Sequence, residues 1–242
     1  ISQVMKKRIV VIGGGVIGLA TAWVLVKQGH QVQLLERNSQ AGVATSFANG
    51  GQLSYRYVAP LADKGVPMQG LKWMGKSDSP LNMRLRMSLS QWRWLLAFLL
   101  ACNNRTNKLN GDHILRLSLL SRQVMEAWLL EDNLDDFHWR RSGKLIIHRR
   151  QQDLAKAAKG INPHFQQTLL REECVHLEPA LKHIGNSLCG GIYSPGDETA
   201  DCYKFCQALL AKLNASANFS LQTDCEVLQL NKKGERIVSI TT

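Results

Sequence analysis

The sequence lacks several features that would assign it to a common functional class. Its six cysteines include no C-x-x-C pair and no zinc-ligand spacing with histidine, so no structural zinc or dithiol centre is expected. The uncharged run Trp94–Cys102 is too short to cross a bilayer. No long basic block and no nucleic-acid-binding motif occurs, so nucleic acid is not an expected partner.

Acidic residues are also scarce. The 242 residues contain 30 lysines and arginines against 19 acids, which gives a net charge of +11. A surplus of this size favours an anionic contact surface, such as membrane lipid or an acidic partner. The unpaired cysteines are interpreted as free thiols in a reducing cytosol. No histidine, serine or cysteine stands at a spacing that specifies a nucleophile, and catalytic residues stay unassigned.

The sequence does contain a strand, a glycine turn and a helix in succession. Four β-branched residues, Ile9–Ile12, are typical of a strand buried on both faces. Three glycines then follow in G-x-G-x-x-G register: one for the turn, one for close backbone approach to a pyrophosphate, and one for close helix packing. Phosphates would bind the free N–H groups at the helix start. The residues of this turn are Gly13, Gly14, Gly15, Val16, Ile17 and Gly18.

A second strand and an acid complete this pattern. The expected helix Val16–Gln28 ends at Gly29, a residue suited to the left-handed conformation after a helix. Strand Val32–Leu35 leads to Glu36 and Arg37, and the glutamate is placed to hold a ribose hydroxyl pair. An acid at this position would repel the 2′-phosphate of NADP, so NADP is disfavoured as the ligand. The order of these parts predicts a dinucleotide-binding βαβ unit.

A signal peptide is the alternative interpretation of the same stretch. Lys6, Lys7 and Arg8 precede eighteen uncharged residues, as in the n- and h-regions of a leader. Five of the eighteen are glycine or threonine gathered near the turn, and no small-residue cleavage site follows. The glycine spacing would then be a coincidence, so the dinucleotide interpretation is preferred.

A loop of small residues follows the acid, and it carries a family resemblance. Small side chains at 40–56 would let backbone N–H groups approach a ligand, although a plain connector has a similar composition. The motifs resemble the bacterial D-amino acid dehydrogenases of the FAD-dependent D-amino acid oxidase family. They are T-S-x-A-N-x-G-Q at 45–52, Y-x-A-P at 57–60, G-V-P at 65–67, K-W-M at 72–74, and a second block at 190–201.

The resemblance implies FAD as cofactor and assigns residues to it. Ser46 is expected near the phosphates, and the loop Asn49, Gly51 and Gln52 near the flavin ring. In the family, the backbone of a valine holds the adenine, and alignment puts Cys225 at that position. No metal is implied.

The resemblance also implies a reaction. A D-amino acid loses hydride to the flavin, water hydrolyses the imino acid to a 2-oxo acid and ammonia, and electrons pass to a quinone-linked acceptor. Two other functions stay open. One is an oxygen-using oxidase of glycine or sarcosine, and the other is a nucleotide-binding module without turnover.

The apolar residues between Leu81 and Leu100 recur at helical spacing and end in a tryptophan-rich run. This segment is interpreted as a core helix. The alternative is a helix lying in a membrane interface, with Arg84, Arg86 and Arg93 at the lipid headgroups. The expected location is the cytoplasm, with peripheral contact to the inner face of the cytoplasmic membrane under the second interpretation.

The expected fold class is α/β with mixed α+β parts: a Rossmann-like FAD-binding domain with an inserted, substrate-facing region, truncated at the C-terminus. Residues 5–55 would form the first part of the FAD-binding domain. Residues 56–195 would be the insertion, and residues 196–242 would return to the FAD-binding domain.

Helices are predicted over 112–131, 151–159, 171–177 and 202–213, and strands over 137–148, 218–223 and 225–230. A chain that stops in mid-strand is expected to be inactive alone.

Overall fold

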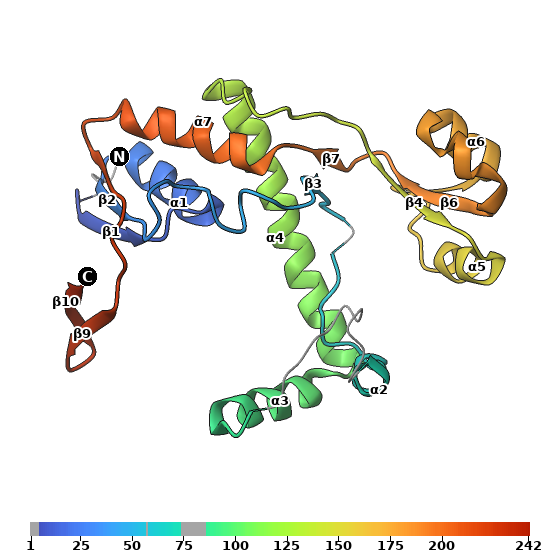
Figure 1. The fold of residues 1–242 in the computed structure, drawn as a ribbon, viewed down its shortest axis with the longest axis horizontal. Helices are drawn as coiled ribbons and strands as arrows, with labels where there is room; N and C mark the ends of the chain where they lie inside the picture. Colours follow the sequence, from blue (N-terminus) through green and yellow to red (C-terminus); the bar gives the residue numbers. More distant parts are fainter. Residues whose placement is uncertain (1–4, 57, 74–85) are drawn as a thin grey trace. The chain divides into compact units, whose positions relative to one another are not determined.

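The computed structural model describes residues 5–56, 58–73 and 86–242 (Figure 1). Tyr57, Met74 and Arg84, which the sequence analysis used, lie outside the described residues. The chain divides into two compact units. Unit 1 contains residues 1–53 and 128–242, and unit 2 contains residues 54–127. Each unit is described by itself.

Unit 1 is built around a parallel sheet. Strand β1 (Arg8–Ile12) pairs with β2 (Gln31–Leu35), and β2 pairs with β8 (Phe219–Gln222), both in parallel. Helix α1 (Val16–Lys27) joins the first two strands, and α7 (Cys202–Asn214) packs against α1 and β8 (Figure 1). The βαβ unit predicted from the sequence is therefore confirmed, and the return strand near residue 220 joins the same sheet.

One expectation about this sheet is wrong. Val32 and Leu34 are buried beneath the helices, at 3% and 0% exposure. On the other face Val10 and Ile12 are 44% and 50% exposed, so β1 is not buried on both faces. The physical reason is that β1 is an edge strand of this sheet, and the described helices cover only one face.

A second sheet in unit 1 is antiparallel. It has the order β4 (Lys144–His148), β6 (Gly190–Ser194), β5 (Gln167–Leu170). Three short helices belong to this part: α5 (Gln151–Lys159) contacts β4 and β6, α6 (Arg171–Leu177) contacts β5 and β6, and η1 (Pro179–Ser187) contacts α6. Helices α5 and α6 lie where the sequence predicted them. Strands β5 and β6 were not predicted.

The strand predicted over 137–148 is wrong in its first half. Arg140 makes only an isolated bridge to Thr199, and regular pairing starts at Lys144. Gly143 has φ +70°, a left-handed conformation that interrupts an extended strand. Two further pairs complete the unit: β3 (Gln52–Leu53) with β7 (Glu198–Thr199), and the hairpin β9 (Gln229–Lys233) with β10 (Arg236–Thr241). The predicted strand at 225–230 thus begins later, at Gln229.

The described residues of unit 2 form helices α2 (Val66–Trp73) and α3 (Leu89–Ala101) and most of α4 (Asn104–Glu131). The residues of α4 from Trp128 onward belong to unit 1. No side chain of α3 is buried, and Trp92 and Trp94 are 50% and 56% exposed. The core-helix interpretation of this segment is therefore wrong for the described chain. No helix in the described ranges is long and apolar enough to cross a membrane.

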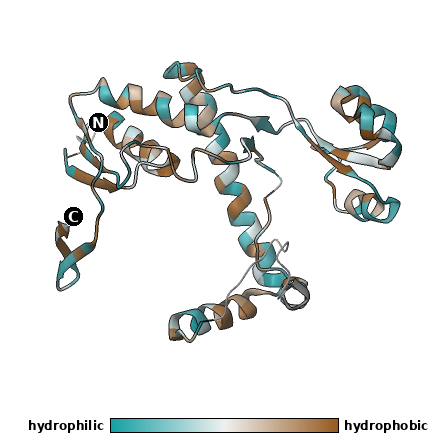
Figure 2. Cartoon of the chain, in the orientation of Figure 1, coloured by the Kyte–Doolittle hydropathy of each residue, from teal (hydrophilic) through white to brown (hydrophobic). Residues whose placement is uncertain are grey.

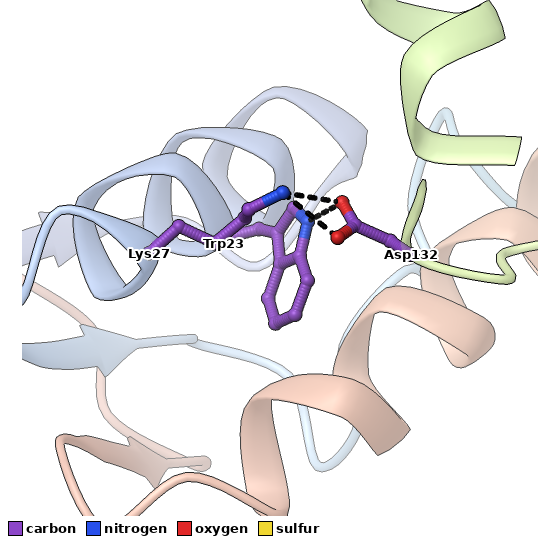
Figure 3. Close-up of polar contacts among 3 residues, drawn as sticks. All are labelled: Trp23, Lys27 and Asp132. Atoms are coloured by element: carbon purple, nitrogen blue, oxygen red, sulfur yellow. Dashed lines mark hydrogen bonds and ion pairs between the residues drawn. The ribbon is translucent and has the colours of Figure 1, made fainter. Parts of the chain in front are cut away.

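The segment after α4 is linked to α1 by the partly buried carboxylate of Asp132 (Figure 3). Asp132 accepts a hydrogen bond from Trp23 Nε1 at 3.1 Å, and Lys27 Nζ lies 2.8 and 2.9 Å from its two oxygens. The Asp132 side chain is 12% exposed and that of Lys27 is 39% exposed. Water therefore screens the charge–charge interaction of Lys27 with Asp132, and the hydrogen bond from the Trp23 indole is less exposed to solvent.

We expect Asp132→Ala to lower the free energy of unfolding by about 1–3 kcal/mol, because it leaves the Trp23 N–H without an acceptor. Asp132→Asn keeps an acceptor for the indole and should lose less. Asp136→Ala removes an exposed carboxylate from the same segment and serves as the control. Urea unfolding followed by circular dichroism measures all three, and equal midpoints for Asp132→Ala and Asp136→Ala would contradict the expectation.

Candidate functional site

The glycine turn follows β1 directly and is shaped by two contacts. Gly13 has φ +97°, and its N–H donates to Leu35 O at 2.7 Å, which ties the turn to the end of β2. Gly18 faces the same turn from α1, and a Cβ added to it would collide with the Gly13 carbonyl oxygen. The third glycine thus lets the helix lie against the turn, as the sequence predicted.

The start of α1 is open to an anion. Helix α1 has Gly15 as its N-cap, without a side-chain cap, and no acid in its first turn. Within the described chain, the N–H groups of Ile17 and Gly18 have no acceptor, and Ile17 is 78% exposed. Unpaired N–H groups and the helix dipole attract negative charge. These groups can therefore receive a phosphate.

Ser46 closes one side of this helix start. It is only 8% exposed, and its Oγ accepts the N–H of Val16 at 3.0 Å. A serine that accepts through its oxygen still carries an O–H donor. Ser46 is therefore next to the expected phosphate position, although the sequence alone did not predict its hydrogen bond to the Val16 N–H.

Helix α7 supports the loop that carries Ser46. Gln207 Nε2 donates to Ala41 O at 3.2 Å, and the Phe47 and Tyr203 rings meet edge to face at 5.0 Å. Cys206 of the same helix is buried, and this burial raises the pKa of its thiol to about 12. All six cysteines are free, and this one is a packing residue rather than a nucleophile.

Glu36 braces the glycine turn from the end of β2. Its Oε2 accepts the Gly14 N–H at 2.6 Å, and its Oε1 accepts both the backbone N–H and the side-chain Nδ2 of Asn38, at 2.9 and 2.6 Å. Burial by itself would raise the pKa of this carboxyl. The hydrogen bonds from Asn38 and Gly14, with the nearby charge of Arg37, outweigh burial and hold the pKa below its ordinary value. Glu36 is thus kept ionised at 6% exposure.

Asn38 is one residue of this site that the sequence analysis missed. An asparagine two positions after an acid, just past a strand end, is a common turn residue, and this signal could have identified it. It orients the carboxylate that the sequence analysis assigned to the ribose. Arg37 is exposed, and its positive charge lies near the Glu36 carboxylate.

The residues expected near the flavin, Asn49, Gly51 and Gln52, adjoin β7. Gly51 has φ +59°, its N–H donates to Asn49 Oδ1 at 2.9 Å, and its carbonyl accepts the Ala200 N–H at 2.8 Å. A Cβ at Gly51 would lie 2.6 Å from Ala200 O. Gln52 pairs with Thr199 in the β3–β7 ladder. These three residues therefore form one wall that packs against residues 199–200. Glu36 and Ser46 make their contacts elsewhere, at the glycine turn and at the start of α1.

Cys225 lies beside Glu36, at 6% exposure, and its N–H donates to Glu36 O at 2.9 Å. That N–H is already occupied, so an adenine could use only the carbonyl of this residue. Val227 follows two positions later, and in the described part of the chain its N–H has no hydrogen-bond partner. The sequence analysis did not consider it.

The chain is similar to known proteins over nearly its whole length. It matches the family described as FAD dependent oxidoreductase over residues 8–242. D-amino acid dehydrogenase 2 of Pseudomonas aeruginosa is 49% identical over 215 residues, which are 88% of this chain and 51% of that protein. The protein of the same name from Ralstonia nicotianae is 36% identical over 240 residues, covering 97% of this chain and 56% of that one. The chain thus spans about half the length of these curated relatives.

Solved structures share the fold at lower identity. Glycine oxidase from Geobacillus kaustophilus superposes with a TM-score of 0.58 at 22% identity, over 93% of this chain and 48% of that one. L-proline dehydrogenase from P. horikoshii gives a TM-score of 0.61 at 16% identity, over 97% of this chain and 48% of that one. At these identities the likeness establishes the fold alone.

Proposed function

The chain belongs to the FAD dependent oxidoreductase family, and from this premise we propose that it serves in an FAD-dependent D-amino acid dehydrogenase. The observation that carries the proposal is the 49% identity with D-amino acid dehydrogenase 2 of Pseudomonas aeruginosa. The reaction is the oxidative deamination of a D-amino acid to a 2-oxo acid and ammonia. A quinone-linked acceptor takes the electrons.

The described residues fit the ADP end of FAD. The open N–H groups of Ile17 and Gly18 and the Ser46 hydroxyl suit the pyrophosphate, and ionised Glu36 suits the ribose hydroxyl pair. The adenine would lie at the backbone of Cys225 or Val227. Bound FAD supplies the acceptor for the hydride that leaves the substrate Cα.

The flavin end depends on the wall made by Asn49, Gly51 and Gln52. Hydride transfer requires alignment of the substrate C–H bond rather than an acid–base pair, and the described wall can fix one side of such an arrangement. The substrate-facing role of residues 56–195 and the return to the FAD-binding domain at 196–242 belong to this proposal.

We expect this 242-residue chain to show no turnover by itself, because one wall leaves a flavin ring open to water. The measurement is dye reduction with FAD and D-alanine, against a flavin-only control. A protein of the relatives' full length should be coloured by flavin and should reduce the dye when a D-amino acid is added. Oxygen consumption with glycine or sarcosine would instead favour the oxidase alternative, and nucleotide binding without any turnover would favour the non-catalytic module.

Contact with the membrane surface is the second part of the proposal. Helix α3 carries stretches of hydrophobic residues (Figure 2). It exposes Trp92 and Trp94 together with Leu96 and Leu100, and these two leucines are 61% and 71% exposed. Exposed Arg93 lies within the same stretch. Aromatic and aliphatic side chains beside cations suit the interface of an anionic bilayer. A quinone-linked acceptor would be reached from such a surface.

The chain should co-sediment with anionic phosphatidylglycerol vesicles and detach as salt rises, because exposed charges are screened beyond ~10 Å at 0.1 M salt. Replacing Trp92 and Trp94 by serine should weaken binding by at least about tenfold, since each side chain contributes roughly 1.5 kcal/mol on burial. Leu228→Ser, which changes a 68% exposed leucine in unit 1, is the matched control. Equal sedimentation of both variants would refute the contact.

A further inference from the structure

A buried glutamate lies on the strand that supports the wall at residues 49–52, which we call the flavin wall. Glu198 belongs to β7, is 2% exposed, and pairs with Leu53 in the β3–β7 ladder. A glutamate is rarely buried this completely unless other groups stabilise it, because removing a carboxylate from water is costly. Its burial therefore requires partners, and residues 139–141 supply them.

Two side chains of the segment after α4 contact the Glu198 carboxylate. Trp139 Nε1 donates to its Oε2 at 2.9 Å, and Arg141 Nε lies 3.6 Å from its Oε1. The Arg141 guanidinium also lies over the Trp139 ring, 5.2 Å from the ring centroid. Because the Arg141 side chain is 62% exposed, water screens its charge, and the indole hydrogen bond is the better protected of the two contacts. These three side chains thus form one cluster.

This cluster lies on the face of the chain that points away from the expected flavin position. Arg140 and Thr199 form an antiparallel bridge and line a pocket of about 470 Å³ together with Gly51. Side chains of extended backbone alternate between two faces, so Trp139 and Glu198 project to the opposite side from their neighbours Arg140 and Thr199. The cluster can therefore fix the flavin wall from behind, without touching a ligand.

Backbone hydrogen bonds connect the cluster to the flavin wall through β7. Arg140 of the segment after α4 exchanges bonds of 2.8 and 2.9 Å with Thr199. On the other side of β7, the Ala200 N–H donates to Gly51 O at 2.8 Å. Strand β7 thus lies between the flavin wall and the segment after α4. The Glu198 side chain adds a buried link between the outer segment and the middle strand.

The segment that carries Trp139 and Arg141 is fixed at both ends. At its start Phe137 is fully buried, and His138, with φ +55°, places its Nε2 3.0 Å from Lys204 Nζ. At its end Gly143, with φ +70°, donates its N–H to residue 197 at 2.9 Å. The few residues between these two ends are held against β7 by the bridge and by the Glu198 cluster.

We propose that Glu198 is a positioning residue for the flavin. Through Trp139 it holds the segment after α4 against β7, and β7 in turn holds the flavin wall where it meets the ring. The inference rests on the proposed function, because it takes residues 49–52 as the wall beside the flavin. It assigns Glu198 no contact with the cofactor or the substrate. The ADP end of the site, at the glycine turn and Glu36, should therefore be indifferent to Glu198.

The test compares FAD with ADP, because ADP has the groups that suit the glycine turn and Glu36 but has no flavin. Titration calorimetry of the flavin-free 242-residue chain gives both affinities. We expect Glu198→Ala to weaken FAD binding by about fivefold or more, the factor for one lost hydrogen bond, and to leave ADP binding within about twofold. A change in the ratio of the two affinities is not expected from a loss of stability alone.

Three results would overturn the proposal. They are an equal loss of FAD and ADP affinity in Glu198→Ala, an unchanged FAD affinity in that variant, and equal affinities for FAD and ADP in the native chain. The proposed function has a separate test, because it fails if a protein of the relatives' full length shows no D-amino-acid-dependent dye reduction, whatever the affinity ratio is.

Two further variants test the route through the indole. Glu198→Gln keeps an oxygen acceptor for Trp139 and should retain most of the FAD affinity. Trp139→Phe removes the donor and should lose as much as Glu198→Ala, and the double variant should lose no more than either, because the pair acts as one unit. Glu172→Gln, which changes an exposed acid of α6, is the control. Additive losses, or a Glu198→Gln variant as weak as Glu198→Ala, would overturn the assignment.

Discussion

Gly18→Ala should abolish flavin retention and destabilise unit 1, because an added methyl group has no room where α1 meets the glycine turn. The added Cβ would overlap the carbonyl oxygen of Gly13, which is backbone and cannot rotate away. Relief requires α1 to move from the turn, and overpacking of this kind costs about 3 kcal/mol. The N–H groups of Ile17 and Gly18 would move with the helix, so the phosphate position would be lost.

Gly65→Ala is the matched control for this substitution. A Cβ at Gly65 meets nothing within 4 Å, and this glycine does not have a positive φ. In a chain of this size each kcal/mol lowers the melting temperature by about 2–4 °C. Thermal unfolding and flavin content after purification therefore separate the two variants. If Gly18→Ala has the same melting temperature and the same flavin content as Gly65→Ala, then neither stability nor flavin binding requires the close approach of α1 to the glycine turn.

The βαβ unit was predictable because short-range rules determine it. The glycines of the turn, the left-handed Gly29 at the end of α1 and the alternation of β2 each depend on residues close in sequence. Glu36 could be placed for the same reason. Its partner Gly14 follows β1 and its partner Asn38 follows β2. The parallel pairing of β1 with β2 brings these two strand ends together, so both contacts follow from the βαβ unit itself.

The antiparallel sheet was not predictable to the same degree. Strand β6 begins with two glycines and lies between β4 and β5, so its pairing depends on segments about 20 to 50 residues away. Gly191 fits because a Cβ there would lie 2.9 Å from Ile146 O, a contact that no local pattern indicates. Strand β4 was expected to begin too early, because the residue pattern of 137–148 did not reveal the left-handed conformation of Gly143 that bounds the strand.

The contact between His138 and Lys204 is also non-local. His138 and Lys204 are 66 residues apart, and neither stands in a recognisable motif. The sequence analysis assigned no role to any histidine, because no local spacing specified a site. The membrane-facing interpretation of α3 could be stated from the sequence. The exposure of its side chains could not be predicted, because an apolar helix of this length has the same composition in a core and on a surface.

Glu36→Ala should weaken FAD binding by about 1–3 kcal/mol and should also destabilise the chain without FAD, because the Gly14 N–H and the Asn38 amide lose their acceptor. Asn38→Ala removes only one of three donors to the carboxylate and should have a smaller effect on both measurements. Titration of apoprotein with FAD gives the affinity, and urea unfolding of the flavin-free chain gives the stability. Unchanged FAD affinity in Glu36→Ala would refute the ribose assignment.

Glu36→Gln separates the charge of this residue from its shape. The amide keeps one oxygen acceptor, but its NH2 group must face either the Gly14 N–H or the Asn38 donors, so one contact becomes donor against donor. The folded-state pKa of Glu36 is lowered, so its carboxylate stabilises the fold fully above the unfolded-state pKa of about 4.3. That stabilisation is lost as pH falls through the lower folded-state pKa. The difference in unfolding free energy between the native chain and Glu36→Gln should therefore be largest near neutral pH and shrink below about pH 4. A difference that stays constant from neutral to acid pH would show that the ionised carboxylate does not brace the turn.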